Sequence, residues 1–126
     1  MIIDFEYSIP TSRGFDLANF FNEFCADYDD PHSPATLHEE WFPAVGEMKV
    51  LAEAYLAATD RGGSEENVKQ LCQEVIAHLP VASLYWAYWC LFTDLASTKS
   101  SKFDYLLAGH LRFQRFLSLT GAPFNE

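Results

Sequence analysis

Two carboxylates near the start of the chain have the spacing of a metal site. Asp4 and Glu6 stand two residues apart in the apolar stretch 1–7. In a β-strand, side chains two residues apart lie on the same face, roughly 6–7 Å from each other. Carboxylate oxygens are the ligands that Mg²⁺ prefers. The same alternation is typical of any strand with one wet and one buried face, and these residues alone favour that simpler interpretation.

Two tryptophans far along the chain have the spacing of a binding surface. Trp86 and Trp89 are three residues apart in 81–92, a stretch that is apolar nearly all round, as in a buried helix. Side chains at this spacing share a helix face. Paired indoles either fill a core or form two walls of a cage for a cation, and the helix alone favours core filling. Buried Tyr and Trp side chains need hydrogen-bond partners, so four of them in two turns indicate a pocket on one side.

Composition and charge limit the class of protein. The 126 residues support one domain with one core, and 49% hydrophobic with 16% aromatic residues indicate a globular chain. The net charge of −10 disfavours nucleic acid and anionic membrane surfaces, and it tolerates a cationic ligand. No run of about 18 residues is apolar throughout, so no membrane span is expected. We also expect no signal peptide, because an apolar strand follows Met1 directly.

The cysteines and histidines lack the spacing of metal or disulfide sites. The three cysteines match neither a zinc motif nor a disulfide framework. We interpret them as buried free thiols in a reducing compartment, and we expect a cytoplasmic protein. The four histidines are interpreted as surface or packing residues. The residues concerned are Cys25, Cys72, Cys90, His32, His38, His78 and His110.

Apolar periodicity predicts a mainly α fold with a short N-terminal strand. Helices are predicted over 17–28, 44–58, 64–79, 81–96 and 102–118, with a short turn near 37–41. Asp16 and Ser64 are predicted N-caps, and Pro43 and Pro80 are predicted to open helices. The apolar stripe of the last helix is expected to include Phe103, Leu106, Leu107, His110, Phe113, Phe116 and Leu117.

The predicted strand has no evident partner elsewhere in the sequence. An isolated strand leaves its backbone N–H and C=O groups without hydrogen bonds. We therefore expect the chain to be the C-terminal piece of a larger protein.

Several motifs together resemble one enzyme family. The first group is Ile3-Asp4-Phe5-Glu6-Tyr7 followed by Arg13-Gly14-Phe15-Asp16, Asn19, Glu23 and Tyr28. The second comprises the segment from Pro43 to Leu56, the aromatic run 85–89, Phe103 with Tyr105, and Arg112-Phe113. In this order and at these gaps they resemble the segments that follow the catalytic loop in choline and ethanolamine kinases. Each motif alone is weak, but the resemblance spans nearly the whole chain.

The resemblance implies a protein-kinase-like fold, of which residues 1–126 would be a single fragment of the C-terminal lobe. Enzymes of this family transfer the γ-phosphoryl of ATP to the hydroxyl of choline or ethanolamine, in phospholipid synthesis. By this resemblance Asp4 binds Mg²⁺ on the phosphates of the co-substrate ATP, and Glu6 is a second acidic residue near the metal. It implies no catalytic base within this chain.

The resemblance also implies a binding site for a small cationic amino alcohol. Tyr7, Tyr28, Trp86 and Trp89 would form its walls, and Glu23 would attract or orient the amine. A quaternary ammonium has no N–H group, so aromatic faces and carboxylates must hold it. Arg13 and Asp16 are instead interpreted as structural, through loop anchoring and helix capping. A homodimer of the full-length protein is left open.

The chain departs from the family pattern at several points. Leu107-Ala108 stands where the family usually carries Asp-Tyr, and the stretch 8–12 differs from its Ser-Ser-Tyr-Asn-Tyr. The small lobe, the glycine-rich loop with its lysine and the catalytic loop with its aspartate and asparagine are absent from this sequence. Phosphoryl transfer requires all these parts in position, so no kinase activity is expected from this chain alone.

Three functions remain open at this point: the C-terminal part of a choline/ethanolamine kinase, a non-catalytic helical module that binds a cationic amine, and a purely structural helical domain. The paired carboxylates Asp4 and Glu6 favour the first. The choice between choline and ethanolamine depends on whether the pocket offers hydrogen-bond acceptors for N–H groups or only aromatic faces for methyl groups.

Overall fold

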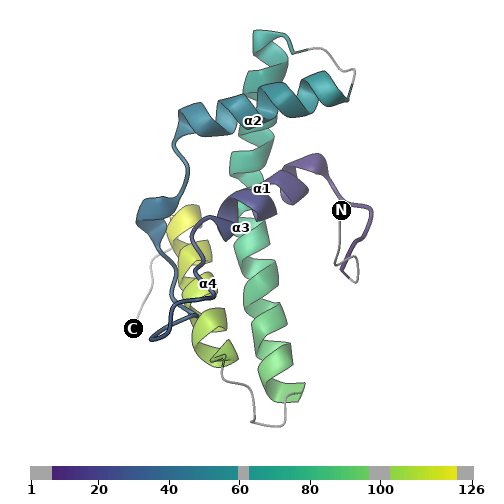
Figure 1. Cartoon of the computed structure of the whole chain (residues 1–126). Helices are drawn as coiled ribbons and strands as arrows, with labels where there is room; N and C mark the ends of the chain where they lie inside the picture. Colours follow the sequence, from purple (N-terminus) through teal and green to yellow (C-terminus); the bar gives the residue numbers. More distant parts are fainter. Residues whose placement is uncertain (1–6, 60–62, 97–102, 122–126) are drawn as a thin grey trace.

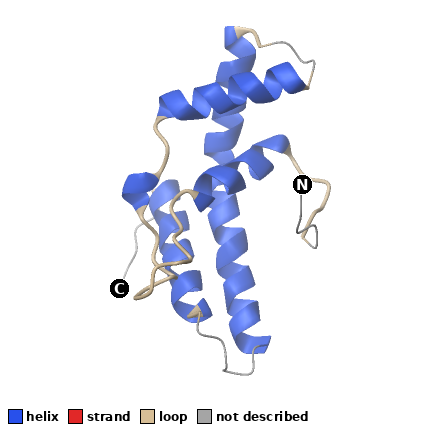
Figure 2. Ribbon diagram, in the orientation of Figure 1, coloured by secondary structure: helices blue, strands red, loops and turns tan. Residues whose placement is uncertain are grey.

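The computed structural model describes residues 7–59, 63–96 and 103–121, and these parts of the chain form helices and loops (Figure 2). The elements are α1 (Arg13–Glu23), the short 3₁₀ helix η1 (Glu39–Trp41), α2 (Val45–Ala58), α3 (Glu65–Ala96) and α4 (Tyr105–Thr120). The predicted mainly helical class is confirmed. The predicted N-terminal strand, with Asp4 and Glu6, lies outside the described residues.

The long helix α3 is the centre of the structure. It runs the length of the molecule, α1 and α2 cross it, and α4 lies alongside it (Figure 1). Leu71, Val75 and Ala82 on α3 are almost completely buried. The main core therefore lies along α3, where Leu17 and Phe21 of α1 meet residues of α2 such as Met48, Ala52 and Leu56. A smaller cluster of Ala35, Cys90 and Ala108 joins α3 to α4.

Length and composition alone would allow α3 to cross a membrane, with a mean hydropathy of 1.4 over its most apolar window. A central helix of a packed bundle meets the same test, and here α3 packs against α1, α2 and α4. We therefore interpret α3 as a core helix.

The prediction that Pro80 opens a new helix is wrong, because α3 continues through it. A proline inside a helix removes one backbone hydrogen bond and costs about 3 kcal/mol. Contacts with α1 and within α3 hold the helix together next to the proline. The carbonyl oxygen of Leu79 accepts hydrogen bonds from Asn22 Nδ2 at 3.2 Å and from Ser83 Oγ at 3.0 Å, and Leu79 and Ala82 are buried in the core.

The predicted bounds and cap of α1 are also wrong. The helix begins at Arg13 because Ser12 Oγ accepts a hydrogen bond from the backbone N–H of Phe15 at 3.1 Å, whereas Asp16 lies exposed in the first turn. The helix ends at Glu23, because the chain then turns to form an isolated bridge between Ala26 and Leu37.

The other helix ends agree with the prediction more closely. α2 starts within one residue of its predicted position, and Glu47 Oε2 accepts a hydrogen bond from the backbone N–H of Ala44 at 2.8 Å. α4 starts later than predicted, because Asp104 Oδ1 accepts a hydrogen bond from the N–H of Leu107 at 2.8 Å. Gly121 then ends α4 in the left-handed conformation, with φ 67°. The predicted turn near 37–41 corresponds to η1.

The predicted apolar stripe of α4 is wrong in part. Leu106, Leu107 and Phe113 are exposed. The buried face instead combines two small residues, which let α4 approach α3 closely, with two arginines whose guanidinium groups have polar partners. These residues are Ala108, Gly109, Arg112 and Arg115.

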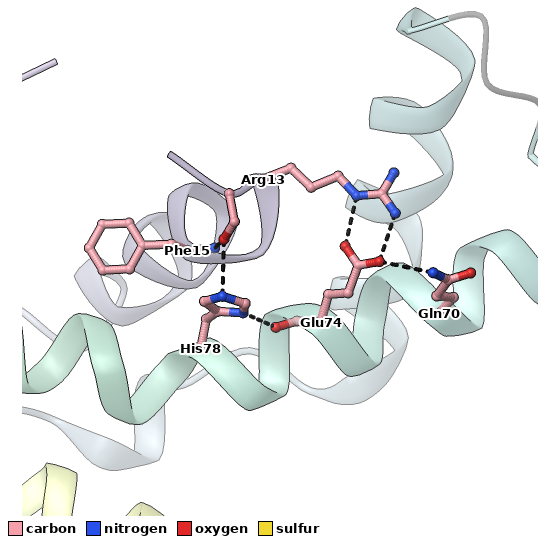
Figure 3. Close-up of polar contacts among 6 residues, drawn as sticks. Arg13, Phe15, Gln70, Glu74 and His78 are labelled. Carbon is pink, nitrogen blue, oxygen red and sulfur yellow. Dashed lines mark hydrogen bonds and ion pairs between the residues drawn. The ribbon is translucent and has the colours of Figure 1, made fainter. Parts of the chain in front are cut away.

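A polar cluster anchors the start of α1 to α3 (Figure 3). Arg13 donates from Nε and Nη2 to the two oxygens of Glu74, at 2.7 and 2.8 Å, and Gln70 Nε2 donates to the same carboxylate at 3.1 Å. His78 Nδ1 lies 2.7 Å from the carbonyl oxygen of Glu74, and its Nε2 lies 3.0 Å from Ser12 Oγ. The interpretation of Arg13 as a structural anchor is confirmed.

Gly14 allows this close approach. A Cβ atom at Gly14 would lie 2.8 Å from His78 Nδ1 and 3.0 Å from the carbonyl oxygen of Glu74. The second atom belongs to the backbone of α3, so a side chain could be accommodated only if the two helices moved apart.

We predict that Gly14→Ala lowers the free energy of unfolding by about 1–3 kcal/mol, because the added methyl group overpacks the α1–α3 contact. Urea denaturation followed by circular dichroism measures this change. Gly46→Ala is the matched control: Gly46 also lies in a helix, and a Cβ there would meet nothing within 4 Å. The control should be neutral or stabilising, by up to roughly 1 kcal/mol. Equal stability of the two variants would contradict the prediction.

We also predict that the Arg13–Glu74 pair makes stability depend on pH. The hydrogen bond from Arg13 is the main cause that lowers the pKa of the Glu74 carboxyl below its ordinary value of 4.5. The ion pair therefore contributes roughly 1 kcal/mol to the free energy of unfolding at pH values above 4.5. This contribution is lost as the pH falls through the lower folded-state pKa of Glu74.

Unfolding free energies of the wild type and Glu74→Gln, measured from neutral to acidic pH, test this. The difference between them should shrink as the pH falls. Glu66→Gln, which changes an exposed carboxylate on the same helix, should show no such convergence. A constant difference for Glu74→Gln would contradict the prediction.

Candidate functional site

A cavity lined largely by aromatic rings lies between α1, α3, α4 and the loop after α1. Its volume is about 490 Å³. α1 supplies an amide and a carboxylate, α3 supplies two indoles, and the loop and the start of α4 supply further rings. The lining residues are Asn19, Glu23, Tyr28, Trp86, Trp89, Cys90, Phe103, Tyr105 and Arg112.

The two indoles form one wall of this cavity. Trp86 and Trp89 share a face of α3, with ring centroids 5.4 Å apart and an interplanar angle of 71°. Trp86 Nε1 donates a hydrogen bond to Asn19 Oδ1 on α1. The predicted need for a polar partner is therefore met for Trp86. Both indoles line the cavity, and Trp89 also packs against the smaller core cluster, so core filling, the interpretation that the helix alone favoured, describes only part of their role.

Tyr7 reaches the indole pair from the other end of the chain. Its ring meets Trp86 edge-on at a centroid distance of 6.2 Å and Trp89 at 6.0 Å. Tyr7 lines a neighbouring cavity of about 590 Å³, to which Trp86 and Asn19 also contribute. Tyr7 is therefore brought to the indoles, but it lies outside the cavity that Glu23 and Tyr28 line.

A chain of hydrogen bonds connects a carboxylate, a phenol and a guanidinium in the aromatic cavity. The hydroxyl of Tyr28 donates to Glu23 Oε2 at 2.6 Å and accepts from Arg112 Nη2 at 3.1 Å. Arg112 is 8% exposed. Residues five apart in a helix point about 140° apart, so the early end of α1 is what lets Tyr28 turn back to Glu23.

The Tyr28 hydroxyl is held in its protonated form. The residue as a whole is 54% exposed, but its hydroxyl lies between Glu23 and Arg112. Burial of this hydroxyl, followed by its hydrogen bond to Glu23, raises the pKa of Tyr28 to about 12. At neutral pH the phenol is therefore a hydrogen-bond donor to the Glu23 carboxylate.

Sequence reasoning assigned no site role to several residues that line the cavity. Asn19, Tyr105 and Arg112 serve there only as marks of the family resemblance, and Phe103 serves also as part of the predicted apolar stripe of the last helix. A signal was available for Arg112, because a helix face that contains Ala108-Gly109 followed at helical spacing by an arginine suggests close packing with a buried charge. Cys90 gave no such signal.

The cysteines are free thiols, as predicted: Cys25 and Cys90 are buried, and Cys72 is half-buried. Burial raises the pKa of the Cys90 thiol. Among the residues that the structure describes, no group of three His, Cys, Asp or Glu side chains could hold a metal ion.

Comparison with known proteins links the chain to one family. A family model described as choline/ethanolamine kinase matches residues 1–117. The chain is 29% identical over 115 residues to a probable choline kinase 2 of Arabidopsis thaliana, an alignment that covers 91% of this chain and 32% of the relative. It is 29% identical over 136 residues to a choline/ethanolamine kinase of Homo sapiens, covering 96% and 32% of the two proteins.

An ethanolamine kinase of Saccharomyces cerevisiae is 32% identical over 93 residues, covering 71% of this chain and 17% of the relative. The chain therefore spans about a third or less of the length of these curated relatives. No solved structure matches the chain.

We predict an alkaline loss of stability that depends on Tyr28. The folded-state pKa of Tyr28 is raised to about 12 from an ordinary value of 10.0. The hydrogen-bonded phenol therefore makes its full contribution to the free energy of unfolding at pH values below the ordinary value. It is lost as the pH rises between the two values, where the phenol ionises more readily in the unfolded chain.

Unfolding free energies measured from about pH 9, below the ordinary value, to about pH 12, the folded-state value, should fall less steeply in Tyr28→Phe than in the wild type. Tyr88→Phe is a matched control, because Tyr88 is similarly exposed on α3 and does not line the cavity. Parallel curves for the wild type and Tyr28→Phe would refute the prediction.

Proposed function

The chain belongs to the choline/ethanolamine kinase family, and we propose that it forms the amine-binding part of an enzyme that phosphorylates the hydroxyl of choline or ethanolamine with ATP. In this proposal residues 1–126 belong to the C-terminal lobe of a protein-kinase-like fold, and the enzyme acts in cytoplasmic phospholipid synthesis. The main support is the aromatic cavity, in which two indoles and a carboxylate from distant parts of the chain meet.

The chemistry of this cavity suits a small organic cation. The faces of Trp86, Trp89 and Tyr28 attract a cation through the ring quadrupole, and the attraction grows as the site excludes water. Glu23 adds a full negative charge at the same cavity. A volume of about 490 Å³ lies within the range of small-molecule sites.

We propose that Asp4 and Glu6 hold the Mg²⁺ that accompanies ATP. Two carboxylates two residues apart are a donor set of hard oxygens, which fits this ion. When bound, the metal ion neutralises charge on the phosphates. This part of the proposal depends on the residue types alone, because both residues lie outside the described part of the chain.

One observation favours a second function, a non-catalytic module for a cationic amine. The described lining residues bring a carboxylate and several aromatic rings to one cavity, and these are the groups that hold a cationic amine. The two functions differ in whether a bound amino alcohol is ever phosphorylated.

We predict that Trp86→Ala and Trp89→Ala each weaken choline binding by about tenfold or more, because each removes a cation–π wall. Isothermal titration calorimetry of the chain measures the dissociation constants. Trp41→Ala is the control, because Trp41 is an exposed tryptophan of η1 that stacks on His38 and does not line the cavity. Undiminished binding in both cavity variants, or an equal loss in the control, would overturn the proposed site.

We further predict that this chain, incubated with choline, ATP and Mg²⁺, forms no phosphocholine. The sequence contains no catalytic loop and no glycine-rich loop of the family pattern, and the chain spans about a third of the length of its relatives. Mass spectrometry of the products tests this. Turnover at a rate typical of kinases, about 1–100 per second, would show that the missing parts are dispensable.

A further inference from the structure

The guanidinium group of Arg112 is an unexpected neighbour for a bound cation. Arg112 lines the aromatic cavity and is 8% exposed. Like charges repel most strongly where water is excluded, so the positive charge of Arg112 by itself opposes the binding of an organic cation. Its place in the cavity therefore indicates a role other than direct contact with the ligand.

The hydrogen bonds of Arg112 show what it holds. Its Nη2 donates to the hydroxyl oxygen of Tyr28 at 3.1 Å, and the same hydroxyl donates to Glu23 Oε2 at 2.6 Å. A phenol has a single O–H group, whose hydrogen rotates to suit its surroundings. Because an N–H of Arg112 approaches the oxygen, the hydrogen of Tyr28 turns away from it and toward the carboxylate. Arg112 thus sets the direction of the bond from Tyr28 to Glu23.

Tyr28 depends on these bonds for its position. It lies in the loop that follows α1 and is 54% exposed. Its ring also meets the ring of Phe103 at a centroid distance of 6.2 Å. An exposed loop residue with few packing contacts is easily displaced. Loss of the Arg112 bond would therefore let this aromatic wall move away from the cavity.

Tyr28 also stands between the two charges of the cavity. In the described part of the chain no ion pair joins Arg112 to Glu23 directly, and the phenol bonds to both. A direct pair with a guanidinium group would commonly occupy both oxygens of the carboxylate. One bond from a neutral phenol leaves the carboxylate its charge and most of its lone pairs. Arg112 therefore acts on Glu23 through Tyr28.

We propose that Arg112 is a positioning residue of the amine site. Its guanidinium group holds the Tyr28 hydroxyl against Glu23, which fixes the ring of Tyr28 as a wall of the cavity and keeps the carboxylate in place for a cationic amine. The inference rests on the proposed function and adds to it a residue that acts through its neighbour.

A double-mutant cycle between Arg112 and Tyr28 tests the proposal. Choline is titrated calorimetrically into the wild-type chain, Arg112→Met, Tyr28→Phe and the double variant. With the Tyr28 hydroxyl present, Arg112→Met should raise the dissociation constant about tenfold, as expected for loss of a hydrogen bond from a charged group. In the Tyr28→Phe background the same change should leave the dissociation constant unchanged or lower it, because it then removes only a repelling charge.

The cycle separates positioning from the two other effects that loss of the arginine could have. A role in packing alone would raise the dissociation constant by the same factor in both backgrounds, and a purely repelling charge would lower it in both. Either result would overturn this inference and leave the proposed function standing. A wild-type chain that binds no choline would overturn the proposed function, and this inference with it.

Two further variants control for general disruption of α4, with urea denaturation as the check on folding. Arg115→Met removes a second buried arginine of α4, one that does not line the cavity, so choline affinity should be unchanged. A loss equal to that of Arg112→Met would contradict the proposal.

Arg112→Lys keeps the charge and a donor but loses the planar guanidinium fork, and it replaces Arg112→Met in the cycle should that variant not fold. Its loss of choline affinity should be smaller and should again require the Tyr28 hydroxyl. A loss that persists in the Tyr28→Phe background would refute the positioning role.

Discussion

The contact between α1 and α3 is the constraint on which the rest of the structure depends. Polar side chains spaced along α1 each bond to α3: Arg13 to Glu74, Asn22 to the Leu79 carbonyl, and Asn19 to Trp86. Gly14 lets the two helices approach closely enough for these bonds to form. Unmade polar bonds in a buried interface are costly, so the series sets both the crossing and the register of α1 on α3.

This register also connects α1 to α4. The side chain of Asn22 donates to α3 and accepts from Arg115 Nε on α4 at 3.3 Å, so one buried amide bridges three helices. Arg115 lies over the ring of Phe42, with its guanidinium carbon 5.0 Å from the ring centroid, and it pairs with Glu39 of η1. A buried arginine is tolerated where its donors find partners, and here those partners join η1, α1 and α4 around α3.

The candidate site is a consequence of the same arrangement. Its walls come from α3, its carboxylate from α1, and its guanidinium from α4, so no single element could form it. The Glu23–Tyr28–Arg112 chain couples the charge of the cavity to the packing of α4. In the proposed function, ligand recognition and helix packing use the same side chains, and polar groups that face the cavity are also bonded within the protein.

The sequence by itself determined the helical class, the bounds of α2, the shared face of Trp86 and Trp89, and the family resemblance. These features follow from local periodicity and from short motifs, which depend only on residues close together in the chain. The continuity of α3 through Pro80, the end of α1 before Tyr28, and the burial of Arg112 were decided by the tertiary structure. Each depends on contacts with segments far away in the sequence, whose free energies outweigh the local preference, and the chain of bonds from Arg112 to Glu23 exists only after those segments have packed.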